Sequence, residues 1–171
     1  MVEAAVDNLL GSKIDEVVVV IGHRAEEVRE VIKDRPVVVA MNKDYQLGML
    51  SSVKCGISHA SKESDAALIA LADQPFIESG IMNRAIDEFL SGDKGIAIPT
   101  YEGRRGHPVI IDLKYRDEIM GLDENVGLRQ LMLDHPDDIL YIEVGRGEIT
   151  RDMDYPEDYQ RELKKMKRND S

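Results

Sequence analysis

The sequence predicts an α/β protein built on an open, mostly parallel sheet. Short apolar runs rich in β-branched or small residues alternate with segments whose apolar residues recur at helical spacing. Unbroken apolar runs are typical of parallel strands buried on both faces, and the helices between them supply the crossover connections. Because only 5% of the residues are aromatic, we expect a mainly aliphatic core.

The first half of the chain alternates between strands and helices. The apolar runs at 17–21, 37–41 and 66–72 predict buried strands. Helical spacing predicts helices at 25–32 and 50–60, between those strands. These elements together indicate successive βαβ units.

The second half begins with a helix that we expect Ser79 to cap and Gly92 to follow. Strand-like segments then flank a turn-rich stretch, which predicts a hairpin with an unusually basic tip. The remaining elements are expected in the order helix, strand, helix. The ranges for this half are 79–90 for the first helix, 95–99 and 108–111 for the hairpin strands, then 126–133, 139–144 and 156–167.

Length and charge limit the class of protein. A chain of 171 residues is near the usual size of one domain, so we expect a single domain over 1–171. With 22 basic and 33 acidic side chains the net charge is -11, which argues against binding nucleic acid or an anionic membrane. Cys55 is the only cysteine, which excludes an internal disulfide. No apolar run is long enough for a membrane helix, and we expect a cytoplasmic protein.

Asp73 is the first candidate for chemistry. It follows the apolar run 66–72, so a parallel-strand reading places its carboxylate at the edge where open α/β sheets bind ligands. A carboxylate there suits Mg²⁺, which takes one or two protein oxygens and completes its shell with water and phosphates. An equally good reading is that Asp73 only stabilises the turn into Pro75.

A second acidic site follows near the end of the chain. Asp152 and Asp154 would point to one side of an extended segment and could complete a metal position. Asp154 and Glu157 also have the spacing of a capping box for the last helix. Asp152 is therefore the better metal candidate.

The basic turn offers candidates for anion binding. Arg104 and Arg105 lie between two glycines, where a tight turn can present guanidinium groups to a phosphate. In the alternative reading they are solvated charges at a hairpin tip. His107 precedes Pro108, which favours an extended backbone that could aim the imidazole at a ligand, although a hydrogen-bonded turn histidine fits as well.

Gly48, Ser51 and Ser52 open the helical segment after the second predicted strand. Free N–H groups and hydroxyls at such a place bind anions or polar ligand edges, although serines also cap helices in many proteins. The sequence contains no P-loop motif, no Gly-x-Gly-x-x-Gly and no Gly-x-Ser-x-Gly, which argues against a P-loop NTPase, an ordinary dinucleotide-binding dehydrogenase and an α/β-hydrolase.

Taken together, the motifs resemble those of the MobA-like NTP transferases, in particular the molybdenum cofactor cytidylyltransferases. Leu-Ala-Asp-Gln-Pro at 71–75 and Gly-Arg-Arg-Gly-His-Pro at 103–108 are the specific elements. The stretches 17–23, 48–52 and 152–158 agree in order and spacing, so that the resemblance covers nearly the whole chain.

The resemblance implies a Rossmann-like three-layer nucleotidyltransferase fold and a magnesium-dependent reaction. Such enzymes transfer CMP from CTP to the phosphate of the molybdenum-pterin cofactor and release pyrophosphate, and here CTP is favoured over GTP. Asp73 and Asp152 match metal-binding positions, while Gly48, Ser51 and Ser52 match the segment beside the nucleotide. The positions of Arg104, Arg105 and His107 face the anionic substrate, and a molybdoenzyme or its chaperone is a further expected partner.

The chain departs from the family pattern at its start. The family opens with a strand and a glycine-rich loop that holds the triphosphate, whereas Met1 falls in the helix that follows that loop. We therefore expect a sheet without its first strand. The alternative to a transferase is a non-catalytic remnant that binds nucleotide, cofactor or a molybdoenzyme partner.

Overall fold

The computed structural model describes residues 1–145 and 149. It begins with helix α1 and continues as a strand–helix–strand unit in which the two strands pair in parallel, from Val18 opposite Val38 to Ile21 opposite Met41. The elements of this part are α1 (Val2–Leu10), β1 (Val18–Ile21), α2 (Ala25–Ile32), β2 (Val38–Met41), the 3₁₀ turn η1 (Tyr45–Leu47) and α3 (Met49–His59). The predicted alternation of strands and helices is confirmed.

A second sheet of five strands holds the rest of the chain. Its elements are β3 (Ala66–Ile69), α4 (Ser79–Ser91), β4 (Ile96–Tyr101), β5 (Arg104–Arg105), β6 (Val109–Asp112), η2 (Leu113–Tyr115), α5 (Arg116–Gly121), α6 (Arg129–Asp134), η3 (Pro136–Asp138) and β7 (Ile139–Glu143). Strand β6 runs antiparallel between β3 and β4, while β7 pairs in parallel with the other edge of β4. Strands β3, β4 and β7 consequently share one direction.

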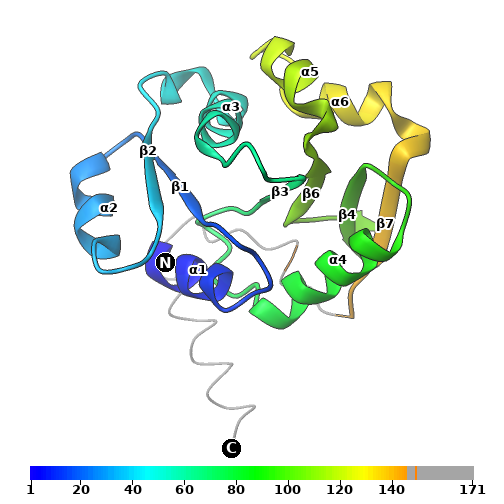
Figure 1. Ribbon diagram of the computed structural model, residues 1–171, viewed down its shortest axis with the longest axis horizontal. Helices are drawn as coiled ribbons and strands as arrows, with labels where there is room; N and C mark the ends of the chain where they lie inside the picture. The colour runs from blue at the N-terminus through cyan, green and yellow to red at the C-terminus, as the bar shows by residue number, and fades with distance from the viewer. Residues whose placement is uncertain (146–148, 150–171) are drawn as a thin grey trace, which may run out of the picture.

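Helices cover both faces of the strands, which gives three layers. In Figure 1, α3, α5 and α6 lie above the strands, and α1 and α4 lie below them. Side chains alternate between the faces along a strand, so Ile96 and Ile98 of β4 enter one core cluster while Ala97 enters the other. The expected α/β class is therefore confirmed, but the strands form two sheets rather than one, and β5 and β6 pair antiparallel with their neighbours.

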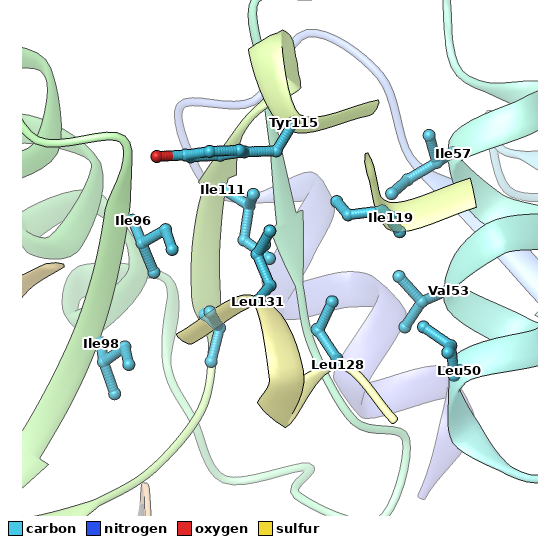
Figure 2. Close-up of a cluster of buried hydrophobic side chains, with 11 residues drawn as sticks. Leu50, Val53, Ile57, Ile96, Ile98, Ile111, Tyr115, Ile119, Leu128 and Leu131 are labelled. Atoms are coloured by element: carbon cyan, nitrogen blue, oxygen red, sulfur yellow. The ribbon is translucent and has the colours of Figure 1, made fainter. Parts of the chain in front are cut away.

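The core cluster that contains Ile96 and Ile98 is mainly aliphatic, as the composition predicts. It joins α3 to β4, β6, α5 and α6, and Tyr115 is its one aromatic member (Figure 2). Its buried members are Leu50, Val53, Ile57, Ile96, Ile98, Val109, Ile111, Tyr115, Ile119, Leu128 and Leu131. Since α3 also contacts β1 and β2, this helix bridges the two sheets.

Three details differ from the sequence prediction. Strand β3 ends at Ile69 rather than at residue 72, because the backbone turns and Gln74 N–H donates to Leu71 C=O at 3.3 Å. Helix α4 has Glu78 at its N-cap, so Ser79 is its first residue and does not cap it. The helix expected at 126–133 begins only at Arg129, after a turn in which Gly127 has a φ of 78°.

The helix expected at 156–167 lies outside the described residues. Among the residues that are described, no helix has the length and the apolar content that crossing a bilayer would require.

Candidate functional site

Asp73 lies in the turn that follows β3. The backbone of this turn is held by the hydrogen bond from Gln74 to Leu71, and the Asn8 side chain of α1 donates to Pro75 C=O at 2.9 Å. Gln74 is buried, whereas Asp73 is half-buried and has its Oδ1 atom shielded from solvent. The turn is thus as expected, and the metal-binding role of Asp73 stays a prediction.

A pocket of about 280 Å³ lies beside this turn. It brings the loop that carries Asp73 together with the basic turn after β4, although the two are some thirty residues apart in sequence. The lining residues are Leu71, Gln74, Arg104, Arg105, Gly106, His107 and Ile149. Three sequence-predicted site residues, the two arginines and the histidine, therefore line one pocket.

The basic turn is a hairpin whose second strand is β5. Arg104 pairs with Tyr101 and Arg105 with Thr100, so the two arginine side chains leave opposite faces of the strand. Arg105 donates from Nη2 to the hydroxyl of Tyr141 at 2.6 Å, and its Cζ lies 5.1 Å from the centre of the Tyr141 ring. Tyr141 thus fixes Arg105 by a hydrogen bond and a cation–π contact.

Glu143 stabilises the tip of the same hairpin. Its carboxylate accepts hydrogen bonds from Thr100 Oγ1 at 2.8 Å and from the backbone N–H of Glu102 at 3.0 Å. Glu102 has a φ of 49°, in the left-handed region that few residues other than glycine adopt. The bond to Glu143 helps to hold this strained turn in place.

Gly106 allows the hairpin to approach Ile149 closely. A Cβ built on Gly106 would lie 2.2 Å from the carbonyl oxygen of Ile149, a distance that no side chain can tolerate. The next residue, His107, donates its backbone N–H to that same oxygen at 3.2 Å. These two contacts with Ile149 therefore fix the position of the His107 backbone, from which the imidazole extends. The peptide bond between His107 and Pro108 is cis.

The second predicted group, Gly48 with Ser51 and Ser52, lies at the start of α3. Gly48 precedes the helix with a φ of 103°, which explains why glycine is required there. Ser51 is buried and Ser52 half-buried, and both accept hydrogen bonds from the side chain of Asn42. These residues do not line the pocket beside Asp73, so the predicted site residues form two groups.

The remaining residues to be placed are Cys55 and the predicted metal ligands. On α3, burial raises the pKa of the Cys55 thiol, which disfavours the reactive thiolate. Within residues 1–145 and 149, no three histidine, cysteine or acidic side chains are grouped as for a metal cage. A single carboxylate such as that of Asp73 fits a cation that keeps water and phosphate ligands. Asp152 and Asp154 lie outside the described residues.

Three residues of this region were not predicted from the sequence. Asn42 is a polar residue that directly follows the apolar run of β2. The same pattern indicated Asp73, so it could also have indicated Asn42. Tyr141 and Glu143 lie within β7, and their roles depend on the pairing of β7 with β4. A strand pattern alone carries no information on that pairing.

Comparison with known proteins identifies a family. A family model described as "MobA-like NTP transferase domain" matches residues 1–139. Nicotine blue oxidoreductase of Paenarthrobacter nicotinovorans is 30% identical over 126 residues, which cover 70% of this chain and 60% of that protein. The bifunctional protein GlmU of Staphylococcus saprophyticus is 29% identical over 87 residues, 51% of this chain and 19% of GlmU. The chain thus spans less than two thirds of either relative.

Solved structures share the fold. A nucleotidyl transferase from Methanothermobacter superposes with a TM-score of 0.81 at 24% identity, covering 98% of this chain and 81% of that one. Rv0371c of Mycobacterium tuberculosis, in complex with manganese, gives 0.80 at 20% identity, covering 95% and 85%. CMP:2-keto-3-deoxy-manno-octonic acid synthetase complexed with CTP gives 0.76 at 12% identity, covering 98% and 88%. The Rossmann-like nucleotidyltransferase architecture expected from the sequence is therefore confirmed.

Proposed function

The chain belongs to the MobA-like NTP transferase domain family, and from that premise we propose that it transfers a nucleotidyl group from a nucleoside triphosphate to a phosphate of a second substrate. The proposed donor is CTP, the proposed acceptor is the phosphate of the molybdenum-pterin cofactor, and pyrophosphate is released. The acceptor phosphate oxygen forms the new bond to the α-phosphorus as the bond to pyrophosphate breaks, so no redox partner is needed.

The observation that carries this proposal is the pocket that joins the Asp73 loop to the two arginines. Nucleotidyl transfer requires that anionic groups be held in line and that their charge be offset, with little covalent work by the protein. Arg104, Arg105 and His107 line this pocket and carry positive or hydrogen-bonding groups. In a chain with a net charge of -11, basic residues at this pocket favour an anionic substrate.

Mg²⁺ is the proposed metal, and Asp73 would hold it, with Asp152 as the second proposed ligand. When bound, a divalent cation offsets the negative charge on the phosphates of the substrate. The chain itself would orient the acceptor through Arg104 and Arg105. At the start of α3, the segment that carries Gly48, Ser51 and Ser52 would lie beside the nucleotide. This leaves the protein with the task of positioning two anions.

The proposal is tested by measuring pyrophosphate release. The full chain is incubated with molybdenum-pterin and, in turn, CTP, GTP, ATP or UTP, with Mg²⁺ or with EDTA. We expect release that requires the pterin phosphate and the metal and that is highest with CTP. Release with GTP alone would show that the donor is GTP rather than CTP. The lack of release with all four nucleotides would overturn the proposed activity.

A second candidate is binding without nucleotidyl transfer, in the service of molybdoenzyme maturation. It is considered because a relative that shares 30% identity is named for an oxidoreductase rather than for a transferase. The same assay separates the two, because a binding protein retains nucleotide or pterin in equilibrium dialysis but releases no pyrophosphate. A molybdoenzyme or its chaperone would then be the proposed partner.

A further inference from the structure

Asn42 is a buried polar residue that links the end of β2 to the start of α3. Only 4% of its surface is exposed. Its Nδ2 donates to Ser51 Oγ at 2.9 Å and to Ser52 Oγ at 3.0 Å, and its Oδ1 accepts the backbone N–H of Asp44 at 2.9 Å. Since a backbone N–H can only donate, the bond from Asp44 fixes which end of the amide faces the serines.

The hydroxyl of Ser51 is fully used inside the protein. It accepts one hydrogen bond from Asn42 and has a single proton, for which the carbonyl oxygens of Gly48 at 2.8 Å and Asp44 at 3.0 Å are acceptors. Ser51 is 7% exposed. We therefore assign Ser51 to holding the turn before α3.

Ser52 differs from Ser51 in the direction of its proton. Its oxygen receives a hydrogen bond from Asn42, so its own proton must point away from Asn42. Within residues 1–145 and 149, no hydrogen bond from Ser52 Oγ to another group is found, and the side chain is half-buried rather than buried. The Ser52 hydroxyl is thus oriented as a donor.

We propose that Asn42 is a positioning residue that acts through Ser52, turning its hydroxyl proton toward an oxygen of the bound nucleotide. The inference rests on the proposed function and deepens it, because it separates two serines that the sequence treats alike. Ser52 contacts the ligand, Ser51 stabilises the turn, and Asn42 sets the donor direction of Ser52. A carboxylate at position 42 would reverse that direction, since it can only accept hydrogen bonds.

The test measures the affinity for CTP with Mg²⁺, and for GTP with Mg²⁺, by titration calorimetry on the full chain. The variants are Ser52→Ala, Ser51→Ala, Asn42→Asp and the double variant Asn42→Asp with Ser52→Ala. We expect Ser52→Ala and Asn42→Asp each to weaken binding about tenfold, the size of one hydrogen bond to a charged group. Ser51→Ala should keep its affinity within about twofold but unfold at a lower temperature.

The double variant separates positioning from simple charge repulsion. Any repulsion between the introduced carboxylate and the nucleotide persists when Ser52 is absent, so Asn42→Asp in the Ser52→Ala background measures that part alone. Acting through Ser52 predicts a loss there of less than about threefold, well short of multiplying the two single effects. The matched control is Asn83→Asp, whose side-chain oxygen also accepts a backbone N–H, from Lys13 at 2.7 Å, but which lies on α4.

Two results would overturn the inference while leaving the proposed function standing. One is multiplicative losses in the double variant, and the other is a loss of affinity in Ser51→Ala that Ser52→Ala does not share. If Asn42→Asp fails to fold, the serine variants still test the division of roles between Ser51 and Ser52 on which the inference depends. A parent chain that binds neither CTP nor GTP would instead overturn the proposed function itself.

Discussion

In the pocket, the difference between arginine and lysine is one of hydrogen-bonding geometry, because both carry the same charge. Arg105 is already oriented by Tyr141, whereas Arg104 leaves the opposite face of β5. A guanidinium group offers several N–H donors in a fixed plane and can bind two oxygens of one phosphate. The ammonium of lysine lacks that fixed geometry.

Changing both Arg104 and Arg105 to lysine should lower kcat/KM for the molybdenum-pterin substrate about tenfold at fixed CTP. The measurement is initial-rate kinetics of pyrophosphate release. Arg84→Lys serves as the control, since Arg84 lies on α4 in an exposed ion pair with Glu88. If the double variant kept the parental kcat/KM, both arginines would have to be interpreted as solvated surface charges instead.

Asp138 illustrates a stabilising rather than a functional carboxylate. Burial by itself raises its pKa, but hydrogen bonds from Lys114, Tyr115 and the backbone N–H of Gly95 outweigh burial and lower the pKa to about 2. The Lys114 Nζ lies 2.8 Å from Oδ2, and Gly95 N lies 3.0 Å from Oδ1. The ionised form of Asp138 is therefore favoured by folding.

A depressed pKa contributes stability that is present above the unfolded value, near 4, and is lost as the pH falls through the folded value of about 2. Asp138→Asn should lower the free energy of unfolding by about 2 kcal/mol at pH 7. The difference from the parent should shrink below pH 4. Urea unfolding at several pH values measures it, with Asp137→Asn, an exposed neighbour, as the control. A difference that stayed constant down to pH 2 would contradict this account.

Among the elements, the short hairpin β4–β5 determines the position of the residues that line the pocket. Its position depends on the contact between Gly106 and Ile149, which leaves no space for a side chain. An added methyl group must push the hairpin away from Ile149, and displacements of about 1 Å in a site can reduce activity by up to 10²-fold.

Gly106→Ala should therefore lower kcat/KM roughly 10- to 100-fold, by moving Arg105 and His107 relative to the Asp73 loop. Gly80→Ala is the matched control, because a Cβ on Gly80 meets no atom within 4 Å. Gly80 lies in the first turn of α4, where alanine should be neutral or slightly stabilising. Parental kinetics for Gly106→Ala would mean that the hairpin does not set the pocket geometry.

The elements also show where sequence patterns were informative. The range of α2 followed from helical spacing, and the ranges of β1 and β2 followed to within one residue from their apolar runs. The predicted burial of β2 was wrong, because β2 lies in a two-stranded sheet and leaves Val38 and Met41 exposed. The end of β3 could not be predicted in this way, because Leu71 and Ala72 are apolar but lie in a turn that is stabilised by backbone hydrogen bonds. Ser79 was misplaced by one position because Glu78 has the extended backbone of an N-cap without a capping side chain.

For the whole molecule, residue type indicated the candidate groups, but pairing between distant elements arranged them. Asp73 and Arg104 were predicted as separate candidates, and the pocket that joins their segments depends on the order β3–β6–β4–β5. The roles of Tyr141 and Asn42 required contacts over 36 and 9 to 10 positions of sequence. No local pattern encodes such contacts.

The sheets also explain how the two candidate groups can act in one molecule. Helix α3 carries Ser51 and Ser52 at its start, and its buried Leu50, Val53 and Ile57 pack in the cluster that includes β4 and β6. The serines at the end of one sheet and the hairpin of the other are therefore connected through a shared core. This supports a nucleotide and an acceptor held on a common framework.

The most direct test of a metal-dependent transfer centred on Asp73 is the turnover of Asp73→Asn, measured as pyrophosphate release from CTP and molybdenum-pterin across a Mg²⁺ titration. Asp34→Asn, an exposed aspartate next to α2, is the control. We expect Asp73→Asn to fold normally, as judged by circular dichroism, and to turn over on the order of 10²-fold more slowly or worse, while the control matches the parent. Near-parental turnover of Asp73→Asn at saturating Mg²⁺ would contradict it.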